Sequence, residues 1–361
     1  MSAREAVGEN LGIRPTPLTA APALVCDWLE IKAASQPNGR YPLARLKRTW
    51  DVNRETEDSD PEGQLEREVD TDSQGVGGED ADAFLDSITD ELGDRLEALD
   101  EAYPFEITAG GNMISLKSDP GFGGYVYLFC LFLSHAKPGE ILDGRWLPKI
   151  THKTRDLFQA CATLAAAHEV TGCAISFGWP RPNQNPPFLT KLREVYQLFG
   201  EGEVVSAPRQ GASPSPKDEE IDVIAWRPTA DKAPGTQYLL GQVASGDNWE
   251  AKSVKGPPIE KFHSVWFNQS PPSTPLPYIF IPHAVAPNST GDRADAMSIK
   301  TITFGTVLDR LRLPKSAELG LRIASLPGST LTIERVADAP SVSIWVDKQI
   351  ASLRAAQSID A

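Results

Sequence analysis

The chain contains 361 residues, of which 40% are hydrophobic and 23% are charged, and its formal net charge is -14. This apolar fraction is enough to bury a core, which excludes a wholly disordered chain, and at about 150 residues per domain the length predicts two domains. The longest apolar run, residues 125–133, is much shorter than the roughly 20 residues of a membrane-spanning helix, so we expect no membrane association. No secretion signal precedes the first predicted helix, and we expect a cytoplasmic protein.

The negative charge is concentrated in one segment. Residues 51–100 contain 19 of the 49 acidic residues and only three basic ones, whereas the rest of the chain is close to neutral. The acidic average therefore does not exclude a nucleic-acid partner. Residues 51–80 also lack aromatic side chains, a composition typical of segments that do not fold alone, and we interpret them as a flexible insertion.

The part before residue 150 predicts a mixed α+β domain made of an N-terminal helical segment (1–50), the insertion and residues 81–150. Periodic apolar residues predict an amphipathic helix over 24–33 and a second helix over 84–99 that is capped by Asp82. Two strands, 103–108 and 113–117, are expected around a glycine-rich turn. Pattern alone does not decide whether the buried run 124–134 is a helix or a strand.

A second domain is predicted over residues 151–361. Its core, 152–286, reads as α-β-β-β-α-β, with helices over 156–169, 188–200 and 259–267 and strands over 203–207, 221–226, 237–244 and 277–285. The C-terminal extension is expected to pack onto this core, with helices over 304–313 and 342–356 and strand-like segments over 321–326 and 330–336. The overall expectation is an α/β (α+β) protein with a mixed sheet.

Two polar residues lie in neighbouring predicted strands of this core. Asp222 is inside the strand 221–226, and Gln242 is near the end of the next one. Paired strands can bring such residues together, and a carboxylate beside amide and backbone carbonyl oxygens supplies the hard ligands that Mg²⁺ or Mn²⁺ requires. The backbone carbonyl of Val243 is a further candidate ligand. Lys252, just before the following helix, is the candidate for holding the attacking water or the scissile phosphate.

The element order and these two strands resemble the PD-(D/E)xK, or restriction-endonuclease-like, nuclease superfamily. The sequence IDVIAW followed by GQVASGDNW is similar to nuclease domains of bacterial restriction and anti-phage loci, including the Mrr-like branch, in which glutamine replaces the second acid. The family pattern has lysine at the position of Ala244, so Lys252 would take over that role. Supporting residues implied by the resemblance are a residue of the first or second helix, Gln159 or Glu194, and the nearby acids Asp247 and Glu250.

Several other residues are candidates for contacts with nucleic acid. Lys255, Arg310 and Arg312 could bind phosphates, Trp249 could stack on a base, and His283 could contact phosphate. Each has a structural alternative: Trp249 could be a core residue, His283 a hydrogen-bonded histidine at a strand end, and the two arginines charges on a helix surface.

The resemblance implies a metal-dependent endonuclease that hydrolyses DNA as the effector of a bacterial anti-phage defence or restriction system. Other proteins of that system, and a homo-oligomer, are the partners it implies. An alternative is a nuclease-fold subunit that has lost catalysis and serves as a nucleic-acid-binding or assembly module, because Gln242 and Ala244 depart from the family pattern. A third possibility is a plain α/β interaction protein. The acidic segment could act as a mimic of DNA.

Overall fold

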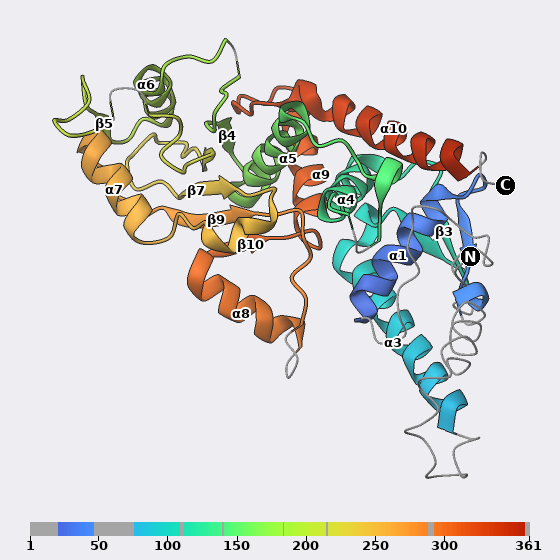
Figure 1. Ribbon diagram of the computed structural model, residues 1–361. Coiled ribbons are helices and arrows are strands. Elements are labelled where there is room, and N and C mark those ends of the chain that lie inside the picture. Colours follow the sequence, from blue (N-terminus) through green and yellow to red (C-terminus); the bar gives the residue numbers. More distant parts are fainter. Residues whose placement is uncertain are drawn as a thin grey trace. The chain divides into compact units, whose positions relative to one another are not determined.

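The computed structural model describes residues 21–46, 76–108, 112–138, 141–182, 184–213, 216–287 and 292–357 (Figure 1). The chain divides into two compact units: unit 1 contains Met1–Pro120, His135–Lys149 and Val346–Ala361, and unit 2 contains Gly121–Ser134 and Ile150–Trp345. The chain thus changes unit near the expected boundary at residue 150, but both units are discontinuous in sequence. Most of the predicted insertion, residues 51–75, lies outside the described residues, whereas its last five residues are helical.

In its described residues, unit 1 contains a three-stranded antiparallel sheet, two long helices that lie wholly within it, and the end of α10 (Ala339–Gln357) from residue 346. The helices are α1 (Pro22–Ser35) and α3 (Val76–Leu99), followed by the short helix η3 (Asp100–Ala102), and a further short helix, η4 (Gly144–Trp146), comes later in the chain. The sheet has the order β1-β3-β2, from β1 (Arg40–Pro42), β3 (Met113–Leu116) and β2 (Phe105–Ile107). The predicted β2–β3 hairpin is confirmed. The predicted cap at Asp82 is wrong, because α3 begins six residues earlier.

Helix α1 is buried on all sides from Val25 to Ser35, so the predicted amphipathic character is wrong. The buried charges Asp27 and Glu30 are compensated by Arg95 of α3, whose side chain is fully buried. Its Nη1 atom is 2.7 Å from Asp27 Oδ1 and 2.9 Å from Glu30 Oε1, and its Nε atom is 2.8 Å from Glu91 Oε1. Tyr103 donates a further hydrogen bond to Glu30 at 2.8 Å. Paired in this way, carboxylates can be buried at a tolerable cost.

Unit 2 is built on a five-stranded mixed sheet with the order β10-β9-β7-β6-β4. The β4–β6 and β6–β7 pairs are antiparallel, and the β7–β9 and β9–β10 pairs are parallel. The strands are β4 (Cys173–Ser176), β6 (Val223–Trp226), β7 (Tyr238–Val243), β9 (Leu276–Phe280) and β10 (Thr306–Leu308). The helices are α4 (Gly121–Ser134), α5 (His152–Val170), α6 (Phe188–Phe199), α7 (Pro257–Trp266), α8 (Arg293–Phe304), α9 (Leu313–Ala324) and the first part of α10 (Ala339–Gln357).

Helices cover both faces of this sheet. Alternate residues of β4, β6 and β7 join α6 and α7 in one apolar core, which includes Ile175, Ile224 and Leu240. The other face is covered by α5, and α9 packs on α5. Gly320 of α9 permits this close approach, because a Cβ atom there would lie 1.8 Å from the carbonyl oxygen of Leu164. Unit 2 is therefore a three-layer α/β/α arrangement (Figure 1).

The core strands differ from expectation at one point. Residues 203–207 were expected to form the first core strand, but β5 (Glu203–Val204) pairs with β8 (Phe267–Gln269) in a separate two-stranded sheet. The first strand of the main sheet is β4, which the sequence did not indicate. All four of its residues are buried, so it lacks the polar–apolar alternation that identifies a strand with one solvent face.

The C-terminal predictions are correct only for the last helix, α10. The expected helix over 304–313 is wrong: α8 ends at Phe304, Gly305 has a φ of 81°, and β10 follows. The expected strand over 321–326 lies in α9 and the loop after it. Of the segment 330–336, Ile333 forms a parallel bridge with Ala174 of β4. The undecided run 124–134 is helical, within α4. Among the described residues, no helix combines the length and apolar character needed to cross a bilayer.

Candidate functional site

The backbone of Asp222 is fixed by two other strands. Asp222 immediately precedes β6, and its N–H donates to the carbonyl oxygen of Gly241 in β7 at 2.8 Å. Its own carbonyl oxygen accepts hydrogen bonds from the N–H groups of Phe177 and Gly178, which follow β4, at 2.7 and 2.9 Å. These backbone contacts hold Asp222 at the point where β4, β6 and β7 meet.

The Asp222 side chain is half-buried and has an unusual proton affinity. Burial raises its pKa from 3.8 to about 7, and the negative charges of Asp218 and Glu220 act in the same direction. The N–H of Val243 donates to Oδ2 at 2.8 Å, and this hydrogen bond, together with the charge of Lys252, lowers the pKa. Asp222 can therefore gain or lose a proton near neutral pH, a property that is common at functional sites.

Gly178 leaves room for two side chains to meet. A Cβ atom on Gly178 would lie 2.3 Å from Asp222 Oδ1, 2.6 Å from Gln159 Nε2 and 2.9 Å from Gln159 Oε1. Gln159 of α5 donates from Nε2 to the hydroxyl oxygen of Ser176 at 2.9 Å and to the carbonyl oxygen of Asp222 at 3.3 Å. Of the supporting residues that the resemblance implied, Gln159 is thus placed beside Asp222.

Gln242 lies in β7 between two residues that contact Asp222. The carbonyl oxygen of Gly241 accepts from the N–H of Asp222, and the N–H of Val243 donates to Asp222 Oδ2. The Gln242 side chain is 7% exposed, and its Oε1 atom is buried without a hydrogen-bond partner among the described residues. An acceptor buried in this way costs free energy that a bound cation could recover.

Lys252 lies close enough to Asp222 for its positive charge to lower the carboxyl pKa. It is half-buried and directly follows the short helix η5 (Asp247–Ala251), five residues before α7 begins. Ala244, where the family pattern has lysine, is fully buried in an apolar cluster with Trp249 and Ile279. A charge at position 244 would have to enter this cluster, whereas Lys252 reaches the site from the chain segment beyond it.

The remaining supporting candidates lie elsewhere. Glu194 is exposed on α6 and is absent from the charges that shift the pKa of Asp222. Glu250 is exposed and forms an ion pair with Lys300 of α8. Asp247 is exposed at the first turn of η5 and is also absent from the charges that act on Asp222. The structure therefore places Gln159 and the charge of Lys252 near Asp222, and it places Gln242 on the neighbouring strand β7.

Two of the expected nucleic-acid contacts have structural roles. Trp249 is only 9% exposed, and its ring packs against Phe304 with a centroid distance of 5.2 Å. The Nζ atom of Lys255 donates to the carbonyl oxygens of Thr301 and Ile302, at 3.3 and 2.7 Å, and so binds the C-terminal end of α8. These contacts favour the core alternative for Trp249.

The basic edge expected from Arg310 is contradicted. Arg310 is 2% exposed, and its guanidinium carbon lies 5.6 Å from the ring centroid of Tyr127 in α4, so it is neither an exposed phosphate ligand nor a helix-surface charge. Its backbone N–H donates to the carbonyl oxygen of half-buried His283 at 3.2 Å. Of the two arginines at 310 and 312, only Arg312 is therefore exposed.

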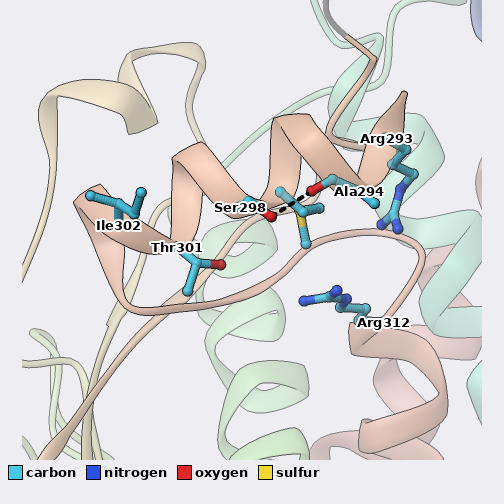
Figure 2. A pocket seen from close by; sticks show the side chains of 7 residues that line it. Arg293, Ala294, Ser298, Thr301, Ile302 and Arg312 are labelled. Atoms are coloured by element: carbon cyan, nitrogen blue, oxygen red, sulfur yellow. Dashed lines mark hydrogen bonds between the residues drawn. The ribbon is translucent and has the colours of Figure 1, made fainter. Parts of the chain in front are cut away.

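Arg312 contributes to a hollow beside α8. It is exposed, and together with Arg293 it lines a space of about 560 Å³ whose other walls include Met297, Thr301 and Ile302 (Figure 2). Figure 2 shows the two arginines on the same side of α8, one from the helix itself and one from the segment before α9. Arg293 is held by Asp309, at 3.0 and 2.8 Å from its two carboxylate oxygens.

The sequence interpretation did not select Asp218, which acts on Asp222, or Trp179 and Lys217, which are linked to Asp218 through the Trp179 backbone and ring. Asp218 raises the pKa of Asp222, and its Oδ2 atom accepts a hydrogen bond from the N–H of Trp179 at 3.5 Å. The Nζ atom of Lys217 lies 4.9 Å from the Trp179 ring centroid. The acidic run 218–222 directly before a buried strand was the available signal for Asp218. No comparable signal identified Trp179, because its proximity depends on the loop after β4.

The donor set is compatible with a divalent cation. Mg²⁺ is commonly bound through one or two carboxylates, with waters and substrate phosphates as further ligands. Oδ1 of Asp222 and Oε1 of Gln242 accept no hydrogen bond from described residues, and both are hard oxygen donors, as is the carbonyl of Val243. A group of three or more His, Cys, Asp or Glu side chains suited to a metal is absent from the described part of the chain, so such a site would depend on amide and carbonyl oxygens.

Comparison of the chain with protein-family models, with curated proteins and with solved structures gives no match. Functional inference for this protein therefore rests on the geometry around Asp222 and on the topology of unit 2.

Proposed function

We propose that the protein is a metal-dependent endonuclease that hydrolyses phosphodiester bonds of DNA. The observation that carries this proposal is the Asp222 carboxylate, which has a raised pKa, accepts from the N–H of Val243 and lies near the charge of Lys252. On the neighbouring strand β7, Oε1 of Gln242 has no hydrogen-bond partner among the described residues. A carboxylate with a raised pKa is costly to maintain in a purely structural position, because its charged form is poorly solvated there.

The topology of unit 2 supports the same proposal. When α6 and β5, between β4 and β6, and β8, between α7 and β9, are set aside, α5, β4, β6, β7, α7 and β9 follow one another as α-β-β-β-α-β on a mixed sheet. This is the arrangement implied by the resemblance to restriction-endonuclease-like nucleases. The position of Gln159 at the site also agrees with it, because the Mrr-like pattern has an acidic residue at this position of the first helix.

A divalent cation bound here would polarise the scissile phosphate and lower the pKa of an attacking water. Asp222 and Gln242 would hold it, with the carbonyl of Val243 as an additional donor. The N–H of Val243 fixes one carboxylate oxygen of Asp222 and leaves the other directed toward Gly178 and Gln159. Lys252 places a positive charge near the same carboxylate, where it can hold a phosphate oxygen or the water. Arg312, in the hollow beside α8, offers a charge for a more distant phosphate.

Cleavage of supercoiled plasmid and of labelled oligonucleotides with Mg²⁺ or Mn²⁺ tests this proposal. We expect activity in the wild type, loss of at least about 100-fold in Asp222→Ala and Lys252→Ala, and full activity in Lys153→Ala, which removes an exposed lysine from α5. Equal activity in wild type and Asp222→Ala would indicate a contaminating nuclease. Absence of wild-type cleavage under all metal conditions would refute an autonomous nuclease.

A second candidate is a nuclease-fold module without catalysis. It is favoured by the buried Ala244, by the neutral Gln242 and by the absence of three clustered acids in the described regions. Such a module would bind nucleic acid or a partner protein equally well in Mg²⁺ and in EDTA. In either case the resemblance suggests a role in a bacterial defence or restriction system, which phage-plating assays with the Asp222→Ala variant would test.

A further inference from the structure

One large aromatic side chain is exposed beside the candidate site. Trp179 is 46% exposed, whereas the other described tryptophans are buried or half-buried. It follows Gly178, whose backbone N–H donates to the carbonyl oxygen of Asp222 at 2.9 Å and whose Cβ position lies 2.3 Å from the Asp222 carboxylate. Trp179 is therefore the residue directly after the one that contacts Asp222. Exposure of such a side chain costs solvation free energy that a ligand could recover.

The segment that carries Trp179 is anchored on both sides. Before it, Phe177 is fully buried and donates its N–H to the carbonyl oxygen of Asp222 at 2.7 Å. After it, the Arg181 guanidinium carbon lies 5.2 and 5.5 Å from the ring centroids of Phe177 and Phe188. The Arg181 N–H donates to Asn185 Oδ1 at 3.0 Å. An aromatic ring on such a support is pre-organised, so little conformational entropy is lost when a ligand stacks on it.

One cation lies at this aromatic residue: Lys217 Nζ is over the Trp179 ring, 4.9 Å from its centroid. Of the acids in the adjacent turn, Glu219 is paired with Lys261 at 3.0 Å, and Asp218 accepts backbone hydrogen bonds from Trp179 and Glu220. A ligand that joins a planar ring to an anionic group would engage both the indole and Lys217.

We propose that Trp179 is a stacking platform for an unpaired nucleobase, with Lys217 beside it for the adjoining phosphate, so that the substrate enters the site as a single strand. This inference rests on the proposed function and specifies its substrate class. A base inside a duplex is already stacked on both faces and cannot lie on an indole, whereas unpaired bases stack on aromatic side chains with little dependence on sequence.

Fluorescence anisotropy in EDTA tests the platform without cleavage. A labelled single-stranded DNA oligonucleotide and the same sequence as a duplex are titrated with wild type, Trp179→Ala, Trp179→Phe and Leu198→Ala. Leu198 is a matched control, because it is an apolar residue 57% exposed on α6. We expect Trp179→Ala to weaken single-strand binding by about 5- to 100-fold, Trp179→Phe to retain most of the affinity, and Leu198→Ala to be unchanged.

The outcomes separate this inference from the nuclease proposal. Wild-type affinity of Trp179→Ala for the single strand would overturn the platform, even if the wild type cleaves DNA. Equal weakening of duplex and single-strand binding would overturn the preference for an unpaired base. Selective loss of single-strand binding in a protein that cleaves nothing would support the platform and refute catalysis. If the wild type binds neither oligonucleotide, the platform is overturned, and the cleavage assay with Mg²⁺ or Mn²⁺ decides the nuclease proposal separately.

Discussion

The Oδ1 atom of Asp222 lies 2.3 Å from the position that a Cβ atom on Gly178 would occupy. Real side chains do not approach so closely, so any larger residue at position 178 must displace the carboxylate, the Gln159 amide or the loop itself. Both polar groups belong to the candidate site and reach it from different elements, α5 and the start of β6. A single methyl group at Gly178 would therefore disturb the site without removing any of its functional groups.

Gly178→Ala should reduce nuclease activity by about 100-fold, because displacements near 1 Å in a catalytic arrangement have effects of this size. The measurement is plasmid cleavage at saturating Mn²⁺, accompanied by the thermal midpoint. Gly93→Ala is the control: no atom lies within 4 Å of its Cβ position in α3, and alanine should stabilise the helix slightly. Full activity of Gly178→Ala would show that the Asp222 carboxylate does not need its present position.

Asp222→Asn should stabilise the metal-free protein in a pH-dependent way. The folded-state pKa of about 7 exceeds the ordinary value of 3.8, so between these values the folded state binds more protons than the unfolded state. The free energy of unfolding of the wild type should then fall as pH rises from about 4 to 7, by about 1.4 kcal/mol per pKa unit as an upper limit. Asparagine carries no charge, so the variant should not lose stability in this way as the pH rises.

Urea denaturation of both proteins in EDTA at pH 5 and pH 8 measures the difference. The free energy of unfolding of Asp222→Asn should exceed that of the wild type, and this difference should be larger at pH 8 than at pH 5 by about 1–3 kcal/mol. An advantage that is independent of pH would show that Asp222 has an ordinary pKa in the folded protein.

Gln242→Glu should increase the affinity for divalent cations. The substitution adds a negative charge beside Asp222, where an amide oxygen now has no hydrogen-bond partner among the described residues. In EDTA, two neighbouring carboxylates would repel each other and lower the thermal midpoint, whereas Mn²⁺ would restore it. The metal-induced shift should therefore exceed that of the wild type, and Gln242→Leu should show almost none. Equal shifts in all three proteins would remove Gln242 from the metal site.

Arg95→Leu should strongly destabilise unit 1. The substitution removes the guanidinium that pairs with the buried carboxylates of Asp27 and Glu30, and breaking such a buried pair costs about 3–5 kcal/mol. Arg322→Leu is the matched control, because its ion pair with Glu318 involves a side chain that is 57% exposed, and it should cost less than about 1 kcal/mol. If Arg95→Leu does not fold, Arg95→Lys is measured in its place. We expect its amide protons in α1 and α3 to exchange faster than those of the wild type. Similar losses in Arg95→Lys and Arg322→Leu would contradict the assigned role.

The pairing of β6 with β7 could be predicted from the sequence, because the two strands are consecutive strand-like segments, and they form an antiparallel pair. Helices α6 and α7 could also be predicted from the sequence, since each has a distinct apolar face. Strand β4 was not, because its four buried residues give no periodic signal. Helix α8 was missed, and Gly305, which lies between α8 and β10, was placed inside a single helical run.

The role of Gly178 could not have been found from its surroundings in sequence. It depends on three elements that meet only after the sheet has formed: α5, the loop after β4 and the first residue before β6. The same is true of burial: Arg310 was expected as a surface cation, yet the fold buries it. Long-range packing decides both cases, and no local pattern encodes it.

The contact between Gly320 and the Leu164 carbonyl has a consequence for how this protein can be divided. Helix α9 lies directly on α5, the helix that carries Gln159. After α9, the Glu334 carboxylate accepts a hydrogen bond from the N–H of Ser176 in β4 at 3.0 Å. The fifth strand, β10, also comes from beyond residue 286. A fragment limited to 152–286 would retain Asp222, Gln242 and Lys252. It would lose α9, which packs on α5, and β10, one strand of the sheet. The region after residue 286 is thus a structural part of the site, and sequence changes within it, away from Arg312, should alter activity without touching a substrate.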